Sequence, residues 1–418
     1  MPALAAITIE DVIARRAIRA VYQPIVELAS GRVVAYEALA RGPAGTTLEA
    51  PLDLLDAARA AGLIAELDWA CRVVALQGAL DAGLRRPMRL FVNVAADAVG
   101  TPPPPADLPL VRRALSELDV VFEITEQAIA AKPAEMLVTV DRLRELGCAI
   151  ALDDVGADQR SLALMPFIAP EVVKLDLRLV QNRPSVEIAA IANAVTAEAE
   201  RGDAVIVAEG IETPEHIEVA RALGADYGQG WLFGRPSTDI AVTTTSGIRL
   251  SPRRRSSAHD TRTPFEIVSA ERELRRGDKA LLLTISRQLE RQAAIQGGAT
   301  VLLATFQEAR HFTLPTARMY QRLAGGAAFV GALACDLDPE PVPGVRGARF
   351  GRTDTLAREW NVTVTSPHFA AAFTARDLGD EGGDDMRRRF DFALTYDRDL
   401  AVHAARALMR AVAPTAAT

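Results

Sequence analysis

Short apolar runs alternate with longer stretches of helical periodicity through the first part of the chain. The eight apolar runs are residues 20–28, 33–40, 89–94, 120–125, 149–155, 172–175, 204–210 and 227–233. Between them apolar residues recur at helical spacing, for example at Ile188, Ile191 and Val195 in a segment that Gly202 ends. Strands that alternate with helices in this way are parallel, and eight such units predict a closed (β/α)8 barrel.

The first connection differs from the others. Residues 29–32 can close a hairpin, but they are too few to form a crossover helix. We therefore expect the first two strands to pair antiparallel. Before them, Thr8 and Asp11 have the spacing of a capping box, which predicts a short helix through Arg19.

The composition changes at residues 246–264, which are polar, basic and interrupted by proline and are predicted to be a linker. The run at residues 253–255 either contacts an anionic partner or is simply solvated. We expect the barrel domain at residues 1–245 and a smaller α/β domain at residues 265–418. In the latter, a helical stripe covers residues 281–293, strands are predicted at 300–306, 329–335, 360–365 and 390–396, and a closing helix at 399–412.

Composition narrows the class of protein. The 418 residues are 49% hydrophobic and 24% charged, as expected for two folded domains. A net charge of -7 argues against a nucleic-acid polymer bound through a broadly basic face. Cys71, Cys148 and Cys335 form neither a disulfide framework nor a CxxC site. With no signal peptide and no apolar run of the roughly 20 residues that a membrane span needs, a soluble cytoplasmic protein is expected.

Polar residues stand at or near the carboxyl ends of the predicted strands. They are Glu37, Asn93, Glu123, Asp153, Asp154, Lys174, Glu209 and Gln229. Each alone could be an ordinary strand-end group, but in a barrel all of them face one mouth. Five carboxylates there would repel one another unless cations were bound, which predicts a metal site.

The donor set favours particular metals and a particular chemistry. All of the ligands offer hard oxygens and none is histidine or cysteine, which favours Mg²⁺ or Mn²⁺. The adjacent pair Asp153 and Asp154 is suited to two ions, which can activate water for displacement at phosphorus. Lys174 either assists that step or forms a salt bridge to Asp153 or Asp176. With Arg41 placed to bind a phosphate, the pattern predicts a metal-dependent phosphoester hydrolase.

These residues also occur in sequence segments that resemble the EAL-domain family. The segments are Tyr22-Gln23-Pro24-Ile25, Glu37-Ala38-Leu39-Ala40-Arg41, the strand with Asn93, Glu123-Ile124-Thr125-Glu126, Asp153-Asp154, Lys174-Leu175-Asp176, Ala208-Glu209-Gly210-Ile211-Glu212-Thr213 and Gln229-Gly230. The resemblance covers about residues 10–240. It implies a barrel with one antiparallel strand and a phosphodiesterase that opens cyclic di-GMP to linear pGpG.

The resemblance also implies roles for single residues. As ligands of two Mg²⁺ or Mn²⁺ ions it implies Glu37, Asn93, Glu123, Asp153, Asp154 and Glu209. It implies a catalytic function for Lys174, for Glu209 and for Gln229, which would order the attacking water. Gln23 and Arg41 would contact the guanine and phosphate of cyclic di-GMP, and Glu126 would brace the loop after the Asp pair. A homodimer through the barrel is a further implication.

Two segments depart from the family pattern. The family loop commonly has the sequence Asp-Asp-Phe-Gly-Thr-Gly, whereas this chain has Asp153-Asp154-Val155-Gly156-Ala157-Asp158. The threonine that would partner Glu126 is therefore absent, and so is the second glycine. Asn93 is followed by residues 94–96, Val-Ala-Ala, where the family tends to carry a serine. The altered loop at residues 155–160 leaves open a receptor that binds cyclic di-GMP without hydrolysing it, and a barrel that acts on another phosphoester is the third alternative.

The second domain resembles the DICT sensory domain, which is attached to cyclic di-GMP enzymes and two-component proteins. Residues 281–290 and 395–400 carry this resemblance, which implies regulation of the barrel but no particular ligand. His311, His368 and His403 match no common metal-site spacing. The segment 382–386, Gly-Gly-Asp-Asp-Met, is similar to the GGDEF signature of cyclic di-GMP synthesis, but no apolar strand precedes it and synthesis is not predicted.

Overall fold

In a computed structural model of the chain, the structure describes residues 7–157, 161–241, 247–250, 260–348, 350–379 and 384–413, without the side chains of Glu126, Gln127 and Ser161. The chain divides into two compact units. The first unit comprises Met1–Ala128, Thr139–Ala157 and Pro170–Arg255, and the second comprises Ile129–Val138, Asp158–Ala169 and Ser256–Thr418. Among the described helices, none has both the length and the hydropathy needed to cross a membrane.

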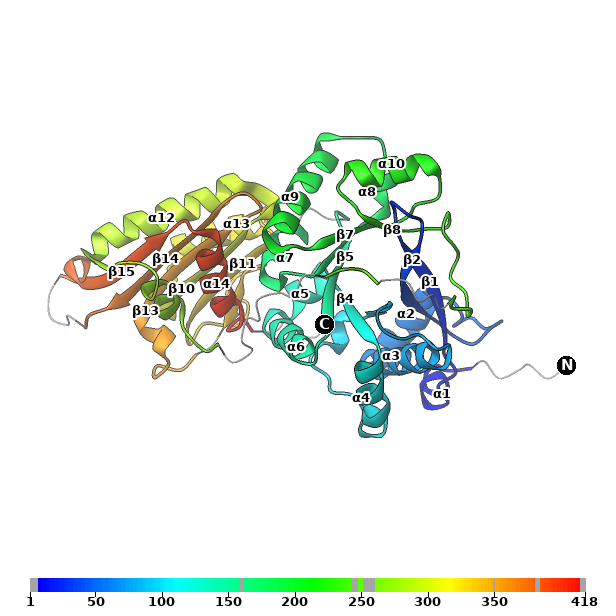
Figure 1. The fold of residues 1–418 in the computed structure, drawn as a ribbon. Helices are drawn as coiled ribbons and strands as arrows, with labels where there is room; N and C mark the ends of the chain where they lie inside the picture. The colour runs from blue at the N-terminus through cyan, green and yellow to red at the C-terminus, as the bar shows by residue number, and fades with distance from the viewer. Residues whose placement is uncertain are drawn as a thin grey trace. The chain divides into compact units, whose positions relative to one another are not determined.

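Eight strands of the first unit close into a barrel in chain order (Figure 1). They are β1 (Arg19–Glu27), β2 (Val33–Arg41), β3 (Arg89–Asn93), β4 (Asp119–Thr125), β5 (Ala149–Val155), β6 (Val172–Leu175), β7 (Val205–Ala208) and β8 (Tyr227–Gln229). Neighbouring strands from β2 to β8 are parallel, whereas β1 is antiparallel to both β2 and β8. The predicted (β/α)8 barrel with one antiparallel strand is confirmed.

Helices alternate with these strands along the chain. They are α1 (Ile9–Ala14), α2 (Pro51–Ala61), α3 (Ile64–Asp81), α4 (Leu108–Glu117), α5 (Glu126–Ala131), α6 (Pro133–Glu145), α7 (Ser161–Ile168), α8 (Leu177–Gln181), α9 (Val186–Gly202) and α10 (Pro214–Ala222). The predicted helix before Gly202 is confirmed as α9, which buries Ile191 and Val195. The first helix is shorter than predicted, because Arg16 adopts a left-handed backbone and β1 begins at Arg19.

The hairpin between β1 and β2 sets the register of the site. Gly31 has a positive φ of 68° in the tight connection, a conformation that glycine adopts without a steric penalty. The resulting register places Gln23 of β1 directly opposite Glu37 of β2. Two residues that lie fourteen positions apart in the sequence therefore become cross-strand neighbours.

The amino-terminal end of the barrel is filled with apolar side chains. Ile25, Phe91 and Val207 belong to this buried cluster, which also contains Ile248. Ile248 is only 2% exposed, and its carbonyl accepts a hydrogen bond from Arg89 Nε at 2.9 Å. Ile248 and Leu250, which fall in the predicted linker, therefore pack with the barrel core. The run at 253–255 lies outside the described residues.

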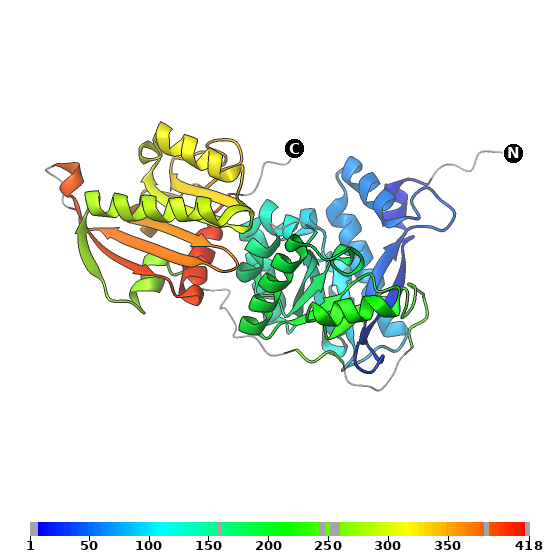
Figure 2. The ribbon, with the colours of Figure 1, turned by 90° about the horizontal axis from the view of Figure 1, so that it is seen from above.

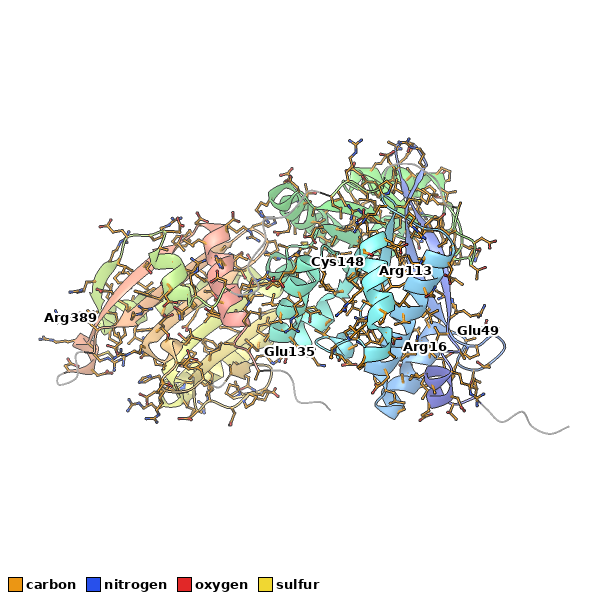
Figure 3. All side chains as sticks on the ribbon, turned by 60° about the horizontal axis from the view of Figure 1, so that its bottom comes forward. Arg16, Glu49, Arg113, Glu135, Cys148 and Arg389 are labelled. Atoms are coloured by element: carbon orange, nitrogen blue, oxygen red, sulfur yellow. The ribbon has the colours of Figure 1, made fainter. Side chains whose placement is uncertain are left out.

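The second unit contains a sheet of seven strands in the order β12-β11-β10-β13-β14-β15-β9. Its strands are β9 (Arg275–Asp278), β10 (Val301–Glu308), β11 (Phe329–Cys335), β12 (Arg346–Ala348), β13 (Glu359–Thr365), β14 (Ala370–Asp377) and β15 (Arg389–Thr395). Its helices beyond residue 260 are α11 (Pro264–Ser269), α12 (Lys279–Gln296), α13 (Leu314–Ala324) and α14 (Arg398–Met409). The smaller α/β domain is thus confirmed, and Figure 2 shows the long helix α12 lying along the sheet.

Helices cover both faces of this sheet. Helix α12 packs on one face with Phe373 of β14, whereas α11 and α14 pack with Ala372 on the other. The predicted strands at 300–306, 329–335, 360–365 and 390–396 correspond to β10, β11, β13 and β15, and the closing helix to α14. The prediction missed β9, β12 and β14. The glycines of the segment 382–386 lie outside the described residues.

Candidate active site

Lys174 lies at the centre of an acidic cluster inside the barrel mouth. Its side chain projects from β6 and the residue is 0% exposed. The ammonium nitrogen lies 2.5 Å from Glu123 Oε1, 2.7 Å from Glu209 Oε1, 3.1 Å from Asp153 Oδ1 and 3.2 Å from Glu37 Oε2. Burial lowers the pKa of Lys174, but these four carboxylates outweigh burial and raise it well above its ordinary value. Lys174 is therefore an ammonium ion.

The strand register explains why these residues meet. Asn93 of β3 lies opposite Glu123 of β4, and Thr125 at the end of β4 lies opposite Asp153 of β5. Glu209 follows β7 directly, so that the carboxyl ends of parallel strands bring the acids to one end of the barrel. The convergence of these residues that the strand pattern predicts is present in the structure.

Glu37 is held by hydrogen bonds from three directions. Its oxygens accept from Asn93 Nδ2 at 3.1 Å, from Gln229 Nε2 at 2.8 Å and from Lys174. Gln229 also donates to Gln23 Oε1 at 3.1 Å. Burial raises the pKa of Glu37, yet Lys174, Gln229 and Asn93 together bring it below its ordinary value. Glu37 is thus an ionised and fully oriented carboxylate.

Asp154 extends the cluster toward solvent. Its carboxylate and those of Asp153 and Glu209 each offer an oxygen within 4.8 Å of the others, a spacing that could hold a metal ion. Asp154 has a positive φ of 55°, which a short polar residue tolerates better than most. This backbone conformation turns the chain sharply at the end of β5, so two adjacent aspartates can serve one site.

The cluster has the properties of a divalent cation site. Neither oxygen of Glu123, nor Oδ1 of Asp153, accepts a hydrogen bond of normal geometry from a described donor, although all three atoms are buried. Burial, followed by neighbouring carboxylates, raises the pKa of Glu123 well above its ordinary value and that of Glu209 to about 8. One ammonium cannot neutralise five carboxylates, so the residues present fit bound divalent cations.

A cavity of about 380 Å³ opens beside Glu37 and Asn93. Arg41 and Arg72 line it. Arg41 donates to the carbonyl of Ala40 at 2.8 Å but forms no ion pair with any described acid. Burial, followed by the nearby charge of Arg19, lowers the pKa of Arg41 below its ordinary value, which reflects the cost of a partly buried cation at this position. The cavity therefore offers a cation to an anionic ligand next to the acidic cluster.

The pair Asp68 and Arg72 on α3 was not predicted from the sequence. Both side chains are buried, they form an ion pair, and Asp68 Oδ1 accepts from the backbone nitrogen of Ala95 at 2.8 Å. The pair thus anchors the chain that leaves β3 just after Asn93. The signal in the sequence is an acid and a base four residues apart on the apolar face of a helix, where they can pair.

Two predicted positions behave differently from the rest. Asp176 caps α8 and forms an ion pair with Arg178 at 2.8 Å. It is not among the four acids that pair with Lys174 in the described part of the chain. The alternative salt bridge from Lys174 to Asp153 is present. The side chain of Glu126 and residues 158–160 of the altered loop lie outside the described residues.

The fold and this site define a (β/α)8-barrel protein with an acidic centre at the barrel mouth. The chain belongs to the EAL-domain family, whose model, described as "EAL domain", matches residues 8–236. Residues 268–378 match a second model, described as "Sensory domain in DIguanylate Cyclases and Two-component system". Both resemblances inferred from the sequence are confirmed.

Two curated relatives are named cyclic di-GMP phosphodiesterases, and each matches about half of this chain. The cyclic di-GMP phosphodiesterase NbdA of Pseudomonas aeruginosa is 34% identical over 227 residues, which are 51% of this chain and 28% of NbdA. RocR, a cyclic di-GMP phosphodiesterase of the same organism, is 31% identical over 52% of this chain and 57% of its own length. The chain thus spans less than two thirds of either relative. A manganese and cyclic di-GMP complex of BlrP1 from Klebsiella pneumoniae is 27% identical over 53% of this chain and 56% of that chain, with a TM-score of 0.46.

Proposed function

We propose that the protein is a metal-dependent phosphodiesterase that hydrolyses cyclic di-GMP to linear pGpG. The observation that carries this proposal is the set of four carboxylates, Glu37, Glu123, Asp153 and Glu209, around the buried ammonium of Lys174. In the reaction, water adds to one phosphorus, the bond from that phosphorus to the ribose 3′ oxygen breaks, and the leaving oxygen takes a proton. Two bound Mg²⁺ or Mn²⁺ ions would supply an activated water and neutralise charge on the phosphoryl group.

Each residue of the site would have a separate role in this reaction. The proposed metal ligands are Glu37, Asn93, Glu123, Asp153, Asp154 and Glu209. Because Lys174 is charged, it serves as a hydrogen-bond donor to the water or to the phosphoryl oxygens rather than as a base. Gln229 would orient the attacking water, Gln23 would contact guanine, and Glu126 would brace the loop.

Arg41 would bind a phosphate group of the substrate, and its replacement tests that role. In Arg41→Ala we expect KM for cyclic di-GMP to rise about 10- to 100-fold with a smaller change in kcat, because a hydrogen bond to a charged group is worth roughly 1.5–3 kcal/mol. Steady-state kinetics of pGpG release measures both constants.

Arg15→Ala is the matched control for that experiment. Arg15 is an exposed arginine of the same unit that pairs with Asp11 four residues away, and its loss should change KM less than twofold. Equal effects of the two substitutions, or a loss confined to kcat in Arg41→Ala, would contradict a phosphate contact at Arg41.

One assay separates the phosphodiesterase from the two alternatives. Purified protein is incubated with cyclic di-GMP and Mg²⁺ or Mn²⁺, pGpG is quantified, and chelator-treated protein and Asp153→Asn serve as inactive references. Binding of cyclic di-GMP without product would favour the receptor, for which the altered residues 155–160 are the motivation. Turnover of bis(p-nitrophenyl) phosphate without binding of cyclic di-GMP would favour another phosphoester as substrate.

The second unit would regulate this activity. The match of residues 268–378 to a sensory-domain model supports the assignment. A homodimer through the barrel and domain boundaries at residues 245 and 264 remain predictions from the sequence. Size-exclusion chromatography with light scattering tests the dimer.

A further inference from the structure

The second unit contains a cavity of about 290 Å³ that none of the roles above uses. Helix α12 lines one side of it, and residues from β10, β13 and β15 line the others. Its size is near the lower end of the range for small-molecule sites. The cavity can therefore hold a molecule with one ring or a fused pair of rings.

Aromatic side chains form part of its wall. Phe306, Trp360 and Phe390 line the cavity, and the rings of Trp360 and Phe390 lie 6.0 Å apart in an edge arrangement. The indole nitrogen of Trp360 donates no hydrogen bond to a described residue, although the side chain is partly buried. Flat faces together with a free N–H group suit a planar ligand with a hydrogen-bond acceptor.

Buried polar groups without full partners line the same cavity. Ser286 is 5% exposed, and its hydroxyl bonds to no other described residue. Glu290 is also 5% exposed; one oxygen accepts from Tyr320 Oη at 3.0 Å, while the other has no described donor. Burial raises the pKa of Glu290 to about 7. Near neutral pH the ionised carboxylate can accept a hydrogen bond from a ring N–H, and the protonated carboxyl can donate one to a ring nitrogen.

The backbone next to these groups is strained. Gln307 lines the cavity with a φ of 59°, which is unusual for a residue other than glycine, and β10 is irregular between Thr305 and Glu308. His311 Nδ1 lies 2.9 Å from the carbonyl oxygen of Phe306, so that this nitrogen carries the proton and Nε2 is left without a described partner. Strain and bulges of this kind concentrate at binding sites.

The charged groups of the cavity indicate the sign of the ligand. Lys279 pairs with Asp385 and Arg310 pairs with Glu308, whereas Arg287 forms no ion pair within the described part of the chain. Arg287 is exposed and lies one helical turn before Glu290 on α12. An unpaired guanidinium beside an aromatic cavity favours an anionic group on the ligand.

We propose that this cavity is a binding site for a small planar heteroaromatic molecule that carries ring N–H groups and one anionic substituent. The ring would lie among Phe306, Trp360 and Phe390, its polar edge would face Ser286 and Glu290, and its anionic group would pair with Arg287. The proposal concerns binding to the second unit and does not require that the barrel hydrolyse cyclic di-GMP.

Four probes test the proposal by isothermal titration calorimetry on the full chain. Indole-3-acetate has the aromatic ring, the N–H and the anion. Of the others, 1-naphthylacetate lacks the N–H, cyclohexylacetate lacks both the N–H and the aromatic ring, and tryptamine replaces the anion by a cation. We expect indole-3-acetate to bind at least tenfold more tightly than each of the others. No binding of indole-3-acetate at millimolar concentration, or equal binding of cyclohexylacetate, would overturn the proposal.

Arg287→Gln and Arg291→Gln form a matched pair of variants. Both arginines are exposed on α12, but only Arg287 lines the cavity, so neither change should unfold the protein. Arg287→Gln should weaken indole-3-acetate at least tenfold and Arg291→Gln less than twofold. Equal effects would refute the site. Binding that persists in a variant without hydrolytic activity would show that this proposal and the phosphodiesterase stand independently.

Discussion

Replacing Lys174 by methionine is expected to lower hydrolysis of cyclic di-GMP at least about 100-fold, the usual loss when one preorganised donor to a reacting group is removed. The same change should lower the free energy of unfolding of the metal-free protein by about 3–5 kcal/mol, because it leaves buried carboxylates without their shared counter-ion. Lys174 contacts four carboxylates, of which those of Glu37 and Glu123 are buried, and it is itself inaccessible to solvent, so water cannot replace the lost ammonium. Release of pGpG with added Mn²⁺ and urea unfolding with chelator measure the two effects.

Arg178→Met is the matched control. Arg178 is a cation paired with a carboxylate, Asp176, in the segment that follows β6, but its side chain is 53% exposed. An exposed pair contributes roughly 0–1 kcal/mol, and hydrolysis should change less than twofold. If Lys174→Met retained activity within about tenfold of wild type while Arg178→Met behaved as expected, the central role of Lys174 would be wrong.

The barrel could be predicted from the sequence because each of its strands is a separate apolar run. Residues 29–32 are too few for a helix, which also revealed the antiparallel pair. The ends of elements were less predictable. The eighth strand ends at Gln229 rather than at residue 233, because the backbone of Ile211 approaches so closely that a Cβ on Gly230 would lie 2.0 Å from its carbonyl oxygen. Such a tertiary contact leaves no local pattern.

Strand β14 was missed for a related reason. Its residues 370–375, Ala-Ala-Ala-Phe-Thr-Ala, have no alternation of polar and apolar side chains, because helices cover the sheet on both sides. Runs of alanine also favour helix by intrinsic propensity, and the sheet overrides that preference. A strand buried on both faces therefore resembles a helix or a loop when only local periodicity is considered.

The candidate site could be predicted to the level of which residues meet. Strand ends in a barrel share one mouth, so Glu37, Glu123 and Asp153 were expected together. Their individual environments could not be foreseen, since they depend on the orientation of side chains. The sequence offers no reason why Glu37 has three donors whereas Glu123 has only the ammonium of Lys174 nearby. The buried pair of Asp68 and Arg72 could not be predicted for the same reason, since it too depends on the orientation of side chains.

That difference leads to opposite expectations for two substitutions that are chemically the same. Glu37→Gln should destabilise the metal-free protein by about 3 kcal/mol, because a neutral amide would replace the carboxylate that accepts from Asn93, Gln229 and Lys174 and would leave the buried ammonium with one anion fewer. Glu123→Gln should cost less than about 1 kcal/mol, because neither oxygen of Glu123 accepts a hydrogen bond of normal geometry from a described donor, so the amide breaks none, and because burial, which raises the pKa of Glu123, penalises its charge. Urea unfolding in chelator at neutral pH compares the two.

Adding Mn²⁺ should remove the distinction between these variants. Each lacks one carboxylate of the proposed metal set, so both should lose at least about 100-fold in hydrolysis and much of the stabilisation that wild type gains from the ion. The pair of variants thus separates stability from function within one cluster, because Glu37 accepts three hydrogen bonds in the metal-free site whereas Glu123 accepts none of normal geometry from a described donor. Equal stability of the two metal-free variants would contradict the hydrogen-bond arrangement around Glu37, and full activity of Glu123→Gln would remove Glu123 from the metal site.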